Sequence, residues 1–283
     1  NGIRQHYSKK KLRKTLWYVF GKNDILCRER SGKDLMKIRK NDIFLYGRKM
    51  LFQMLEILYP RRCAVCDEIE VTGKGICPLC KDKVHVAGEP ACKKCGKPLV
   101  DERKEFCTDC GKKHHVYTQG KAVFVYEGGI RNSMYRFKYG NKREYAEFYA
   151  NAAVEKYGVW LNKIKAEVLI PIPMYSRKKR LRGYNQAEVF ARELGRKAGI
   201  LVDEHLVRRV RNTIPQKELN ESQGHRNLKN AFQLTADIVE YKRVVLVDDI
   251  YTTGSTMDEV SKVLKASGVE NIYYICISIG EGY

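Results

Sequence analysis

The stretch from Val244 to Thr256 constrains the fold of this chain more than any other, because it combines a buried strand, a loop of small polar residues and a helix start. The consecutive apolar residues from Val244 to Val247 predict a parallel strand that is covered on both faces. Asp248 and Asp249 follow at its carboxyl end, the edge where open α/β sheets bind their ligands. The stretch therefore predicts an α/β domain with a binding site at that edge.

The loop after the two aspartates has the composition of a phosphate-binding turn. It consists of hydroxyl residues and one glycine: Thr252, Thr253, Gly254, Ser255 and Thr256. From about Ser255 the apolar residues have helical spacing, so the loop would present the unpaired N–H groups and the positive dipole end of a helix. The same residues occur in many sheets as helix caps alone. A Walker-type loop is excluded, because no Gly-Lys-Ser/Thr follows.

The stretch resembles the phosphoribosyl diphosphate (PRPP) loop of type I phosphoribosyltransferases. The resemblance implies that Asp248 and Asp249 face the 2′- and 3′-hydroxyls of the ribose, and that the loop holds the 5′-phosphate. The implied PRPP-binding residues are Asp248, Asp249, Tyr251, Thr252, Thr253, Gly254, Ser255 and Thr256.

Eight of the ten cysteines form four Cys-x-x-Cys pairs at nearly even spacing. Two such pairs can hold one Zn²⁺ in a tetrahedral site, whereas a redox dithiol would need only one pair. We expect two sequential structural sites rather than interleaved ones, with the ligands Cys63, Cys66, Cys77 and Cys80 in the first and Cys92, Cys95, Cys107 and Cys110 in the second. Because eight thiols suffice, His85, His114 and His115 are expected at the surface.

The chain after the cysteines predicts alternating strands and helices, typical of a mostly parallel sheet flanked by helices. Strands are expected at 121–126, 168–173, 206–210 and 271–278, and helices at 130–139, 144–157 and 185–197. The polar run 211–230 is long for a loop and predicts either a disordered segment or a lid over the site, with Gln216, Arg226 and Asn227 in it.

Basic residues crowd the turn expected after Pro173. They form either a solvated surface or a binding site for the diphosphate of PRPP, whose departure cations and Mg²⁺ would stabilise. We assign the diphosphate to Lys138, Arg177, Arg180, Arg182, Gly183, Tyr184 and Asn185. Arg182, Asp248 and Asp249 are the expected catalytic residues.

Several short motifs narrow the resemblance to the ComF family. Pro171-Ile-Pro173, Arg182-Gly-Tyr-Asn-Gln186, Gln216, Arg226-Asn227 and the PRPP loop stand in that family's order, and Lys138-Tyr139-Gly140 also matches. The cysteine region is similar to the family's N-terminal region, so the resemblance covers about residues 50–283. It implies a type I phosphoribosyltransferase-like domain behind a double zinc ribbon, and a link to natural competence. It does not supply the acceptor of the sugar.

Two functions are compatible with these features. The first is a Mg²⁺-dependent phosphoribosyltransferase that acts on a nitrogenous base. The second is a non-catalytic DNA-uptake factor that binds single-stranded DNA or a helicase partner, with PRPP or a nucleotide as a regulatory ligand. Seven tyrosines lie among basic residues between 117 and 157. They fit single-strand binding, although packing of helices on the sheet is the favoured explanation.

The charge balance favours a polyanionic ligand without selecting one, since 54 Lys and Arg face 33 Asp and Glu, a net charge of +21. No apolar run approaches the ~18–20 residues that cross a bilayer, so a soluble, cytoplasmic protein is expected. We expect a basic extension at 1–49 that is not native to the chain or is disordered; either Met50 is the natural start, or residues 1–49 are an incomplete piece of an upstream segment. A short helix with the double zinc ribbon at 50–116 and the phosphoribosyltransferase-like domain at 117–283 would follow.

Overall fold

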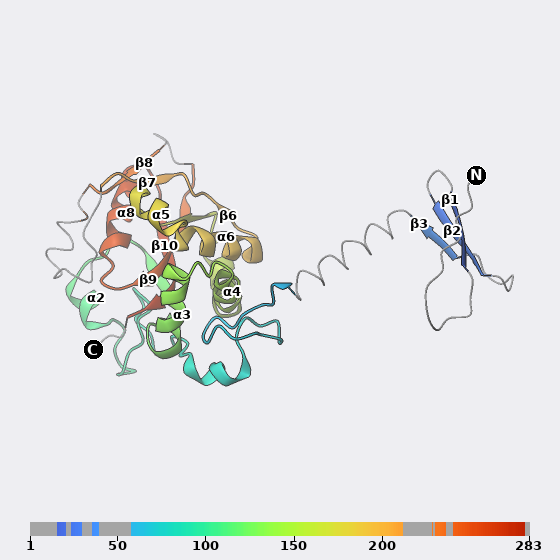
Figure 1. The fold of residues 1–283 in the computed structure, drawn as a ribbon. Helices are drawn as coiled ribbons and strands as arrows, with labels where there is room; N and C mark the ends of the chain where they lie inside the picture. The colour runs from blue at the N-terminus through green and yellow to red at the C-terminus, as the bar shows by residue number, and fades with distance from the viewer. Residues whose placement is uncertain are drawn as a thin grey trace. The chain divides into compact units, whose positions relative to one another are not determined.

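The fold of the chain is that of a computed structural model (Figure 1). It describes residues 58–211, 228, 230–235 and 240–280, and the backbone of three strands nearer the start. The predicted lid residues Gln216, Arg226 and Asn227 lie outside the described residues, as does most of the helix expected at 50–59. The chain divides into two compact units, Asn1–Arg61 and Arg62–Tyr283.

The first unit contains an antiparallel sheet of three strands in the order β1-β2-β3, at Leu16–Phe20, Asp24–Glu29 and Met36–Arg39. These strands lie in the segment that was expected to be a basic extension, either not native to the chain or disordered. Whether residues 1–49 are native to the chain stays a prediction.

The second unit is built on a parallel sheet of five strands in the order β4-β10-β9-β5-β6. The strands span Gln119–Val125 (β4), Val168–Pro171 (β5), Leu201–Val202 (β6), Arg243–Tyr251 (β9) and Asn271–Ile279 (β10). Residues Val244 to Val247 are fully buried, as their unbroken apolar run predicts. The parallel α/β fold is therefore confirmed, and β9 lies at its centre.

Helices cover both faces of this sheet. Gly128–Tyr139 (α3), Tyr145–Lys163 (α4) and Gln186–Ala198 (α6) pack on the face to which Val245 and Val247 point. Ser255–Ala266 (α8) packs on the other face with Val244 and Leu246, beside a two-stranded antiparallel sheet of β7 (Val207–Arg209) and β8 (Phe232–Leu234). β7 confirms the strand expected near 206–210, but it pairs outside the main sheet.

The cysteine region contributes to both layers. It contains the short helices η1 (Pro78–Lys83) and α2 (Thr108–Lys112). Ala64 of the first cysteine group is part of the apolar cluster with α3 and α4, whereas Cys92, Cys95 and Cys107 of the second belong to the cluster with α8. The predicted boundary at residue 116 stays a prediction, since both groups lie in the same compact unit as the sheet.

Among the described helices, none is long and apolar enough to cross a membrane.

Candidate functional site

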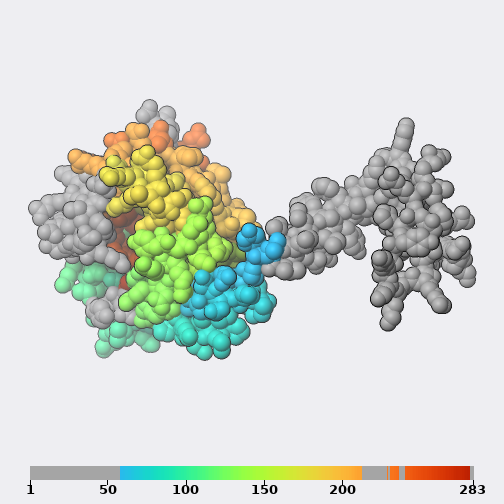
Figure 2. Space-filling model, viewed as in Figure 1, coloured from blue at the N-terminus to red at the C-terminus, as the bar shows by residue number. Residues whose placement is uncertain are grey.

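Three chain turns meet at the carboxyl edge of the parallel sheet. β4 leads into α3, β5 leads into α5 (Ser176–Arg182), and β9 leads through the residues 252–254 into α8. Because parallel strands end at the same edge, side chains from these turns are brought together there. Figure 2 shows red atoms of the C-terminal segment at the base of a hollow beside the green and yellow atoms of the α3 and α5 regions.

The acidic pair carries the clearest chemistry at this edge. Asp248 and Asp249 lie within the last part of β9, and the Asp248 carboxylate accepts a hydrogen bond from the Asp249 N–H at 2.8 Å. Burial, and then the negative charge of Asp249, raise the pKa of Asp248 to about 8. The positive charges of Lys138 and Arg209 oppose this shift without cancelling it. At neutral pH the pair therefore tends to keep one proton in the absence of a ligand.

Lys138 completes this group from α3. Its ammonium lies 2.9 Å from the Asp249 carboxylate, and both side chains are largely buried, with 19% and 17% of their surface exposed. Lys138 had been assigned to the diphosphate. In the structure it pairs with Asp249 and its charge also acts on Asp248, so a cation and two carboxyl groups converge on one place.

The residues after Tyr251 form the loop that was predicted to bind phosphate; we call it the phosphate loop and define it as Thr252 to Thr256. Gly254 caps the N-terminus of α8 with φ +78°, a left-handed conformation that favours glycine. Thr252 and Thr253 are exposed, and the hydroxyls of Thr253 and Ser255 lie 2.9 Å apart. The loop thus presents hydroxyls and the positive end of a helix that is three turns long, which suits a phosphate group.

The Arg182-Gly-Tyr-Asn-Gln186 motif fixes the end of α3. The Tyr184 hydroxyl donates to the carbonyl of Phe137, the residue before Lys138, and the Gln186 side-chain amide donates to the same carbonyl at 3.3 Å. Arg182 in turn donates to the Gln186 side chain at 2.7 Å. These contacts hold the backbone from which Lys138 reaches the acidic pair.

Several residues assigned to the diphosphate differ from expectation. The cations expected in a turn form the helix α5, on which Arg177 and Arg180 are exposed and Arg182 packs over the Tyr139 ring at 5.0 Å. Asn185 is buried, where it caps α6 and donates to the Ile172 carbonyl at 2.9 Å. Tyr184 is also buried. The side chains of Tyr184 and Asn185 thus have structural partners, while their ligand roles stay predictions.

Tyr251 likewise differs from what was expected of a PRPP-binding residue. Its side chain is 4% exposed and points away from the loop surface, into the core with Tyr117 and Tyr274. A ligand at the edge could meet its backbone but not its ring.

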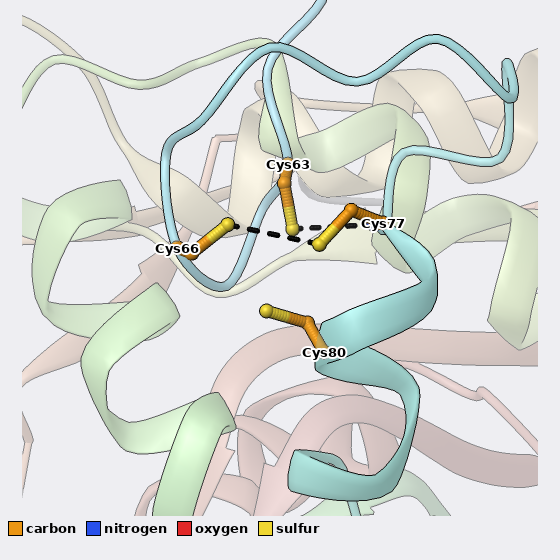
Figure 3. Close-up of side chains that lie close together, drawn as sticks. All are labelled: Cys63, Cys66, Cys77 and Cys80. Carbon is orange, nitrogen blue, oxygen red and sulfur yellow. Dashed lines mark hydrogen bonds between the residues drawn. The ribbon is translucent and has the colours of Figure 1, made fainter.

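The two cysteine groups form two sites in the predicted sequential pairing. In each group, all four sulfur atoms lie within 4.8 Å of one another: Cys63, Cys66, Cys77 and Cys80 in the first (Figure 3), and Cys92, Cys95, Cys107 and Cys110 in the second. Sulfur–sulfur distances of 3.8 Å for Cys66 and Cys77 and 3.7 Å for Cys95 and Cys107 match the about 3.8 Å expected for tetrahedral Zn–S bonds. The donor set fits structural zinc, which four thiolates coordinate fully.

Residues beneath the site were missed by sequence reasoning. His115, expected at the surface, is buried and pairs with Asp258 at 2.8 Å, whereas His85 and His114 are exposed as expected. Tyr117 is fully buried, and Arg209 of β7 contributes positive charge near Asp248. No local signal marks these residues, because their roles depend on segments that lie far apart in the sequence.

Comparison with known proteins agrees with both halves of this architecture. The double zinc ribbon domain family matches residues 54–111, and the phosphoribosyl transferase domain family matches residues 183–279. Competence protein F of Haemophilus influenzae is 44% identical over 108 residues, and competence protein ComFC of Bacillus subtilis is 27% identical over 154 residues. The chain is therefore similar to proteins of the ComF family in both its zinc ribbon and its phosphoribosyl transferase domain. The Escherichia coli K12 relative, DNA utilization protein YhgH, is 34% identical over 109 residues.

Each of these matches covers only part of this chain and part of the relative. The match to competence protein F covers 38% of this chain and 47% of that protein. The match to YhgH covers 38% of this chain and 48% of YhgH, and the match to ComFC covers 53% of this chain and 59% of ComFC. The chain therefore spans about half the length of the curated relatives it matches. A purine phosphoribosyltransferase from Pyrococcus horikoshii is 20% identical, with a TM-score of 0.29, over 47% of this chain and 73% of that one.

Proposed function

We propose that this protein binds PRPP with Mg²⁺ at the carboxyl edge of its sheet and transfers the phosphoribosyl group to a nitrogenous base. The observation that carries the proposal is the convergence of Asp248, Asp249 and Lys138 beside the phosphate loop. In this arrangement the carboxylates would accept hydrogen bonds from the ribose hydroxyls, and the loop would hold the 5′-phosphate.

The residues present also suit the charge changes of such a reaction. The base nitrogen bonds to C1 of the ribose and loses its proton, while the bond from C1 to the diphosphate oxygen breaks. Lys138, Arg182 and the exposed Arg177 and Arg180 supply positive charge for the departing diphosphate. Mg²⁺ prefers carboxylate and phosphate oxygens, so the substrate and the acidic pair fit it, and it would neutralise charge on the leaving group.

Titration calorimetry with Mg²⁺ and PRPP tests the binding. We expect heat of binding for the wild type and about 10- to 150-fold weaker binding for Asp249→Asn, because a hydrogen bond to a charged group is lost. Asp82→Asn, on the exposed surface of η1, is the matched control and should bind as the wild type does. A protein with both zinc ions that gives no heat with PRPP would refute the binding proposal. Diphosphate release with a panel of bases then tests transfer.

A second candidate function is the binding of single-stranded DNA, in keeping with the names of the competence and DNA utilization relatives. Four of the seven tyrosines between 117 and 157 are buried, as packing predicts, but Tyr135 and Tyr139 of α3 are 65% and 64% exposed. Their ring centroids lie 5.1 Å apart, and Arg182 covers Tyr139. Exposed aromatic rings beside cations suit stacked bases.

Fluorescence anisotropy with a labelled oligothymidine tests this second function. Removing one stacking ring costs about 1–3 kcal/mol, so Tyr135→Ala and Tyr139→Ala should each weaken binding about 5- to 150-fold. Val159→Ala, an exposed apolar position on α4, is the matched control. Equal affinity for all variants, or affinity that does not change with salt, would remove this surface from DNA binding.

A further inference from the structure

The segment that leaves the second zinc ribbon passes directly beneath the phosphate loop. His115 Nδ1 lies 2.8 Å from one oxygen of Asp258 in the first turn of α8, and the Val116 N–H donates to the other oxygen at 2.9 Å. Both side chains of the His115–Asp258 pair are nearly free of solvent contact, at 0% and 4% exposure. Among the described residues, His115 Nε2 has no hydrogen-bond partner, so the ring is held from its Nδ1 side.

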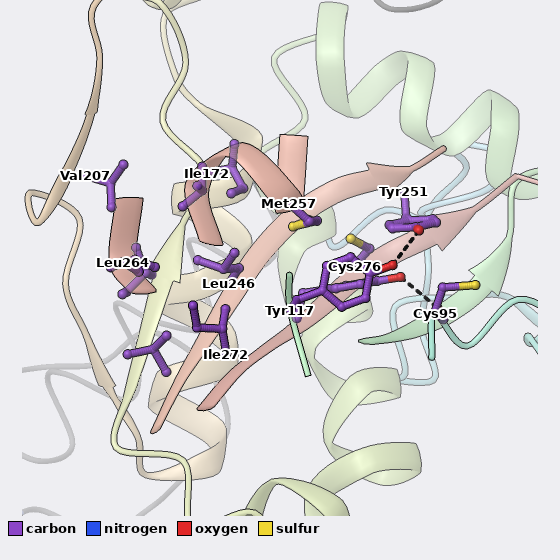
Figure 4. Packing of buried hydrophobic residues seen from close by; sticks show 14 of the residues in the cluster. Cys95, Tyr117, Ile172, Val207, Leu246, Tyr251, Met257, Leu264, Ile272 and Cys276 are labelled. Carbon is purple, nitrogen blue, oxygen red and sulfur yellow. Dashed lines mark hydrogen bonds between the residues drawn. The ribbon is translucent and has the colours of Figure 1, made fainter. Parts of the chain in front are cut away.

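Tyr117 continues this connection on the strand side of the loop. Its hydroxyl pairs with the Tyr251 hydroxyl at 2.8 Å, and Tyr251 immediately precedes the phosphate loop (Figure 4). The Tyr251 ring stacks on Tyr274 at 4.8 Å. Tyr274 donates its hydroxyl to the carbonyl of the zinc ligand Cys95 at 2.7 Å. A chain of buried side chains therefore runs from the second zinc site to the start of the loop.

These side chains also fill the space under Gly254. A β-carbon at this position would lie 2.6 Å from the Tyr251 hydroxyl and 3.0 Å from His115 Cε1. Both distances are well inside normal van der Waals contact, so the underside of the loop rests on these groups. The loop conformation thus depends on where His115 and Tyr251 lie.

The first zinc ribbon has different partners. The Tyr145 hydroxyl donates to Asp67, next to the ligand Cys66, at 2.7 Å, and Lys142 pairs with the same carboxylate at 2.8 Å. Arg136 of α3 donates to the Val65 carbonyl. The first ribbon therefore supports the end of α3 and the turn into α4, on the opposite face of the sheet from α8.

We propose that His115 and Tyr117 are positioning residues for the phosphate loop, so that zinc in the second site and a phosphate ligand at the loop stabilise one another. The ligand half of this proposal rests on the proposed function, whereas the coupling of zinc to the loop does not. Coupling between two bound states is reciprocal, so a ligand that favours the ordered loop must also favour retention of the second zinc.

Hydrogen exchange measured by mass spectrometry tests the zinc half without any ligand. Cys110→Ser removes a ligand of the second site and Cys66→Ser removes one of the first, and both cysteines are partly buried. We expect faster exchange of the amides at 252–258 in Cys110→Ser and unchanged exchange there in Cys66→Ser. If the amides at 252–258 exchange equally slowly in both variants, or equally fast in both, the proposal is overturned.

Two hydroxyl deletions keep both zinc sites intact and guard against a variant that fails to fold. Tyr117→Phe removes the bond to Tyr251, whereas the matched Tyr145→Phe removes a buried tyrosine bond to the first ribbon. We expect about fivefold faster exchange at the loop and about fivefold weaker PRPP binding in Tyr117→Phe only, the effect of one lost hydrogen bond. His115→Asn keeps an N–H donor for Asp258, so the loop amides should exchange more slowly in this variant than in His115→Ala. Identical behaviour of the two tyrosine variants would contradict a role of Tyr117 in positioning.

Zinc release to a chromogenic chelator tests the ligand half. With saturating PRPP and Mg²⁺ we expect severalfold slower release from the second site and unchanged release from the first, the two phases being assigned with Cys66→Ser and Cys110→Ser. If calorimetry has shown binding but both sites release zinc as before, the linkage is wrong. If calorimetry shows no binding, the proposed function fails, and hydrogen exchange alone decides whether zinc positions the loop.

Discussion

Substitution of Gly254 by alanine would test whether the phosphate loop is as tightly supported as the contacts indicate. Gly254 has φ +78°, where an L-residue costs about 1–2 kcal/mol. The added methyl group would also meet the Tyr251 hydroxyl at 2.6 Å and His115 Cε1 at 3.0 Å, and overpacking of this kind costs about 1–3 kcal/mol. Together these effects predict a loss of about 2–5 kcal/mol in the free energy of unfolding.

A matched glycine separates the two contributions. Gly199, after α6, has φ +69°, and a β-carbon there would have no neighbour within 4 Å. Gly199→Ala should therefore lose only the conformational part, about 1–2 kcal/mol. Urea unfolding of the zinc-loaded proteins, followed by circular dichroism, measures both losses.

The comparison of the two variants decides whether His115 and Tyr251 support the loop sterically. If Gly254→Ala and Gly199→Ala lose the same free energy of unfolding to within about 0.5 kcal/mol, the steric support of the loop by His115 and Tyr251 is wrong. A large loss in Gly254→Ala alone, together with weaker PRPP binding, supports a loop whose underside is already filled.

Other predictions concern the acidic pair and its partner. The pKa of Asp248 is raised to about 8, so between about pH 4 and pH 8 the folded protein holds a proton that the unfolded chain has released. The contribution of this proton to the free energy of unfolding is therefore complete below about pH 4 and is lost as pH rises through about 8. In Asp248→Asn, the free energy of unfolding from urea titrations should decline less between about pH 4 and pH 8. An unchanged dependence of this free energy on pH would reject the shifted pKa. Lys138→Met should raise the pKa of Asp248 further, since Lys138 lowers it, and an upward shift in the pH midpoint of the same titrations would show this. Tyr184→Phe should lose about 1 kcal/mol of unfolding free energy and weaken PRPP binding by displacing Lys138; undisturbed PRPP binding would show that Lys138 does not depend on the Phe137 carbonyl.

The elements with strong local patterns could be predicted from the sequence. The unbroken apolar run at Val244–Val247 identified the central strand, and the helical spacing after Ser255 identified α8. The spacing of the cysteines also predicted the sequential pairing of the zinc ligands, because each knuckle pair lies closest to its neighbour along the chain.

The tertiary partners of the site could not be predicted in the same way. Tyr184 and Asn185 carry no mark that distinguishes a ligand-binding side chain from one that caps a helix or holds a carbonyl. His115 was expected at the surface because eight thiols already accounted for both metals, yet its partner Asp258 is 143 residues away. Basic residues after Pro173 indicated a turn, but their helical propensity and the left-handed Gly183 at their end produce α5.

The hydroxyl of Tyr145 and the ammonium of Lys142 share the carboxylate of Asp67, and Ala64 packs among the side chains of α3 and α4. A truncated chain that began at residue 117 would lack Ala64, Ile76 and Val84, and would therefore expose part of the apolar cluster against which they pack. Such a fragment is expected to aggregate when expressed alone, so the sheet domain should be studied together with the cysteine region.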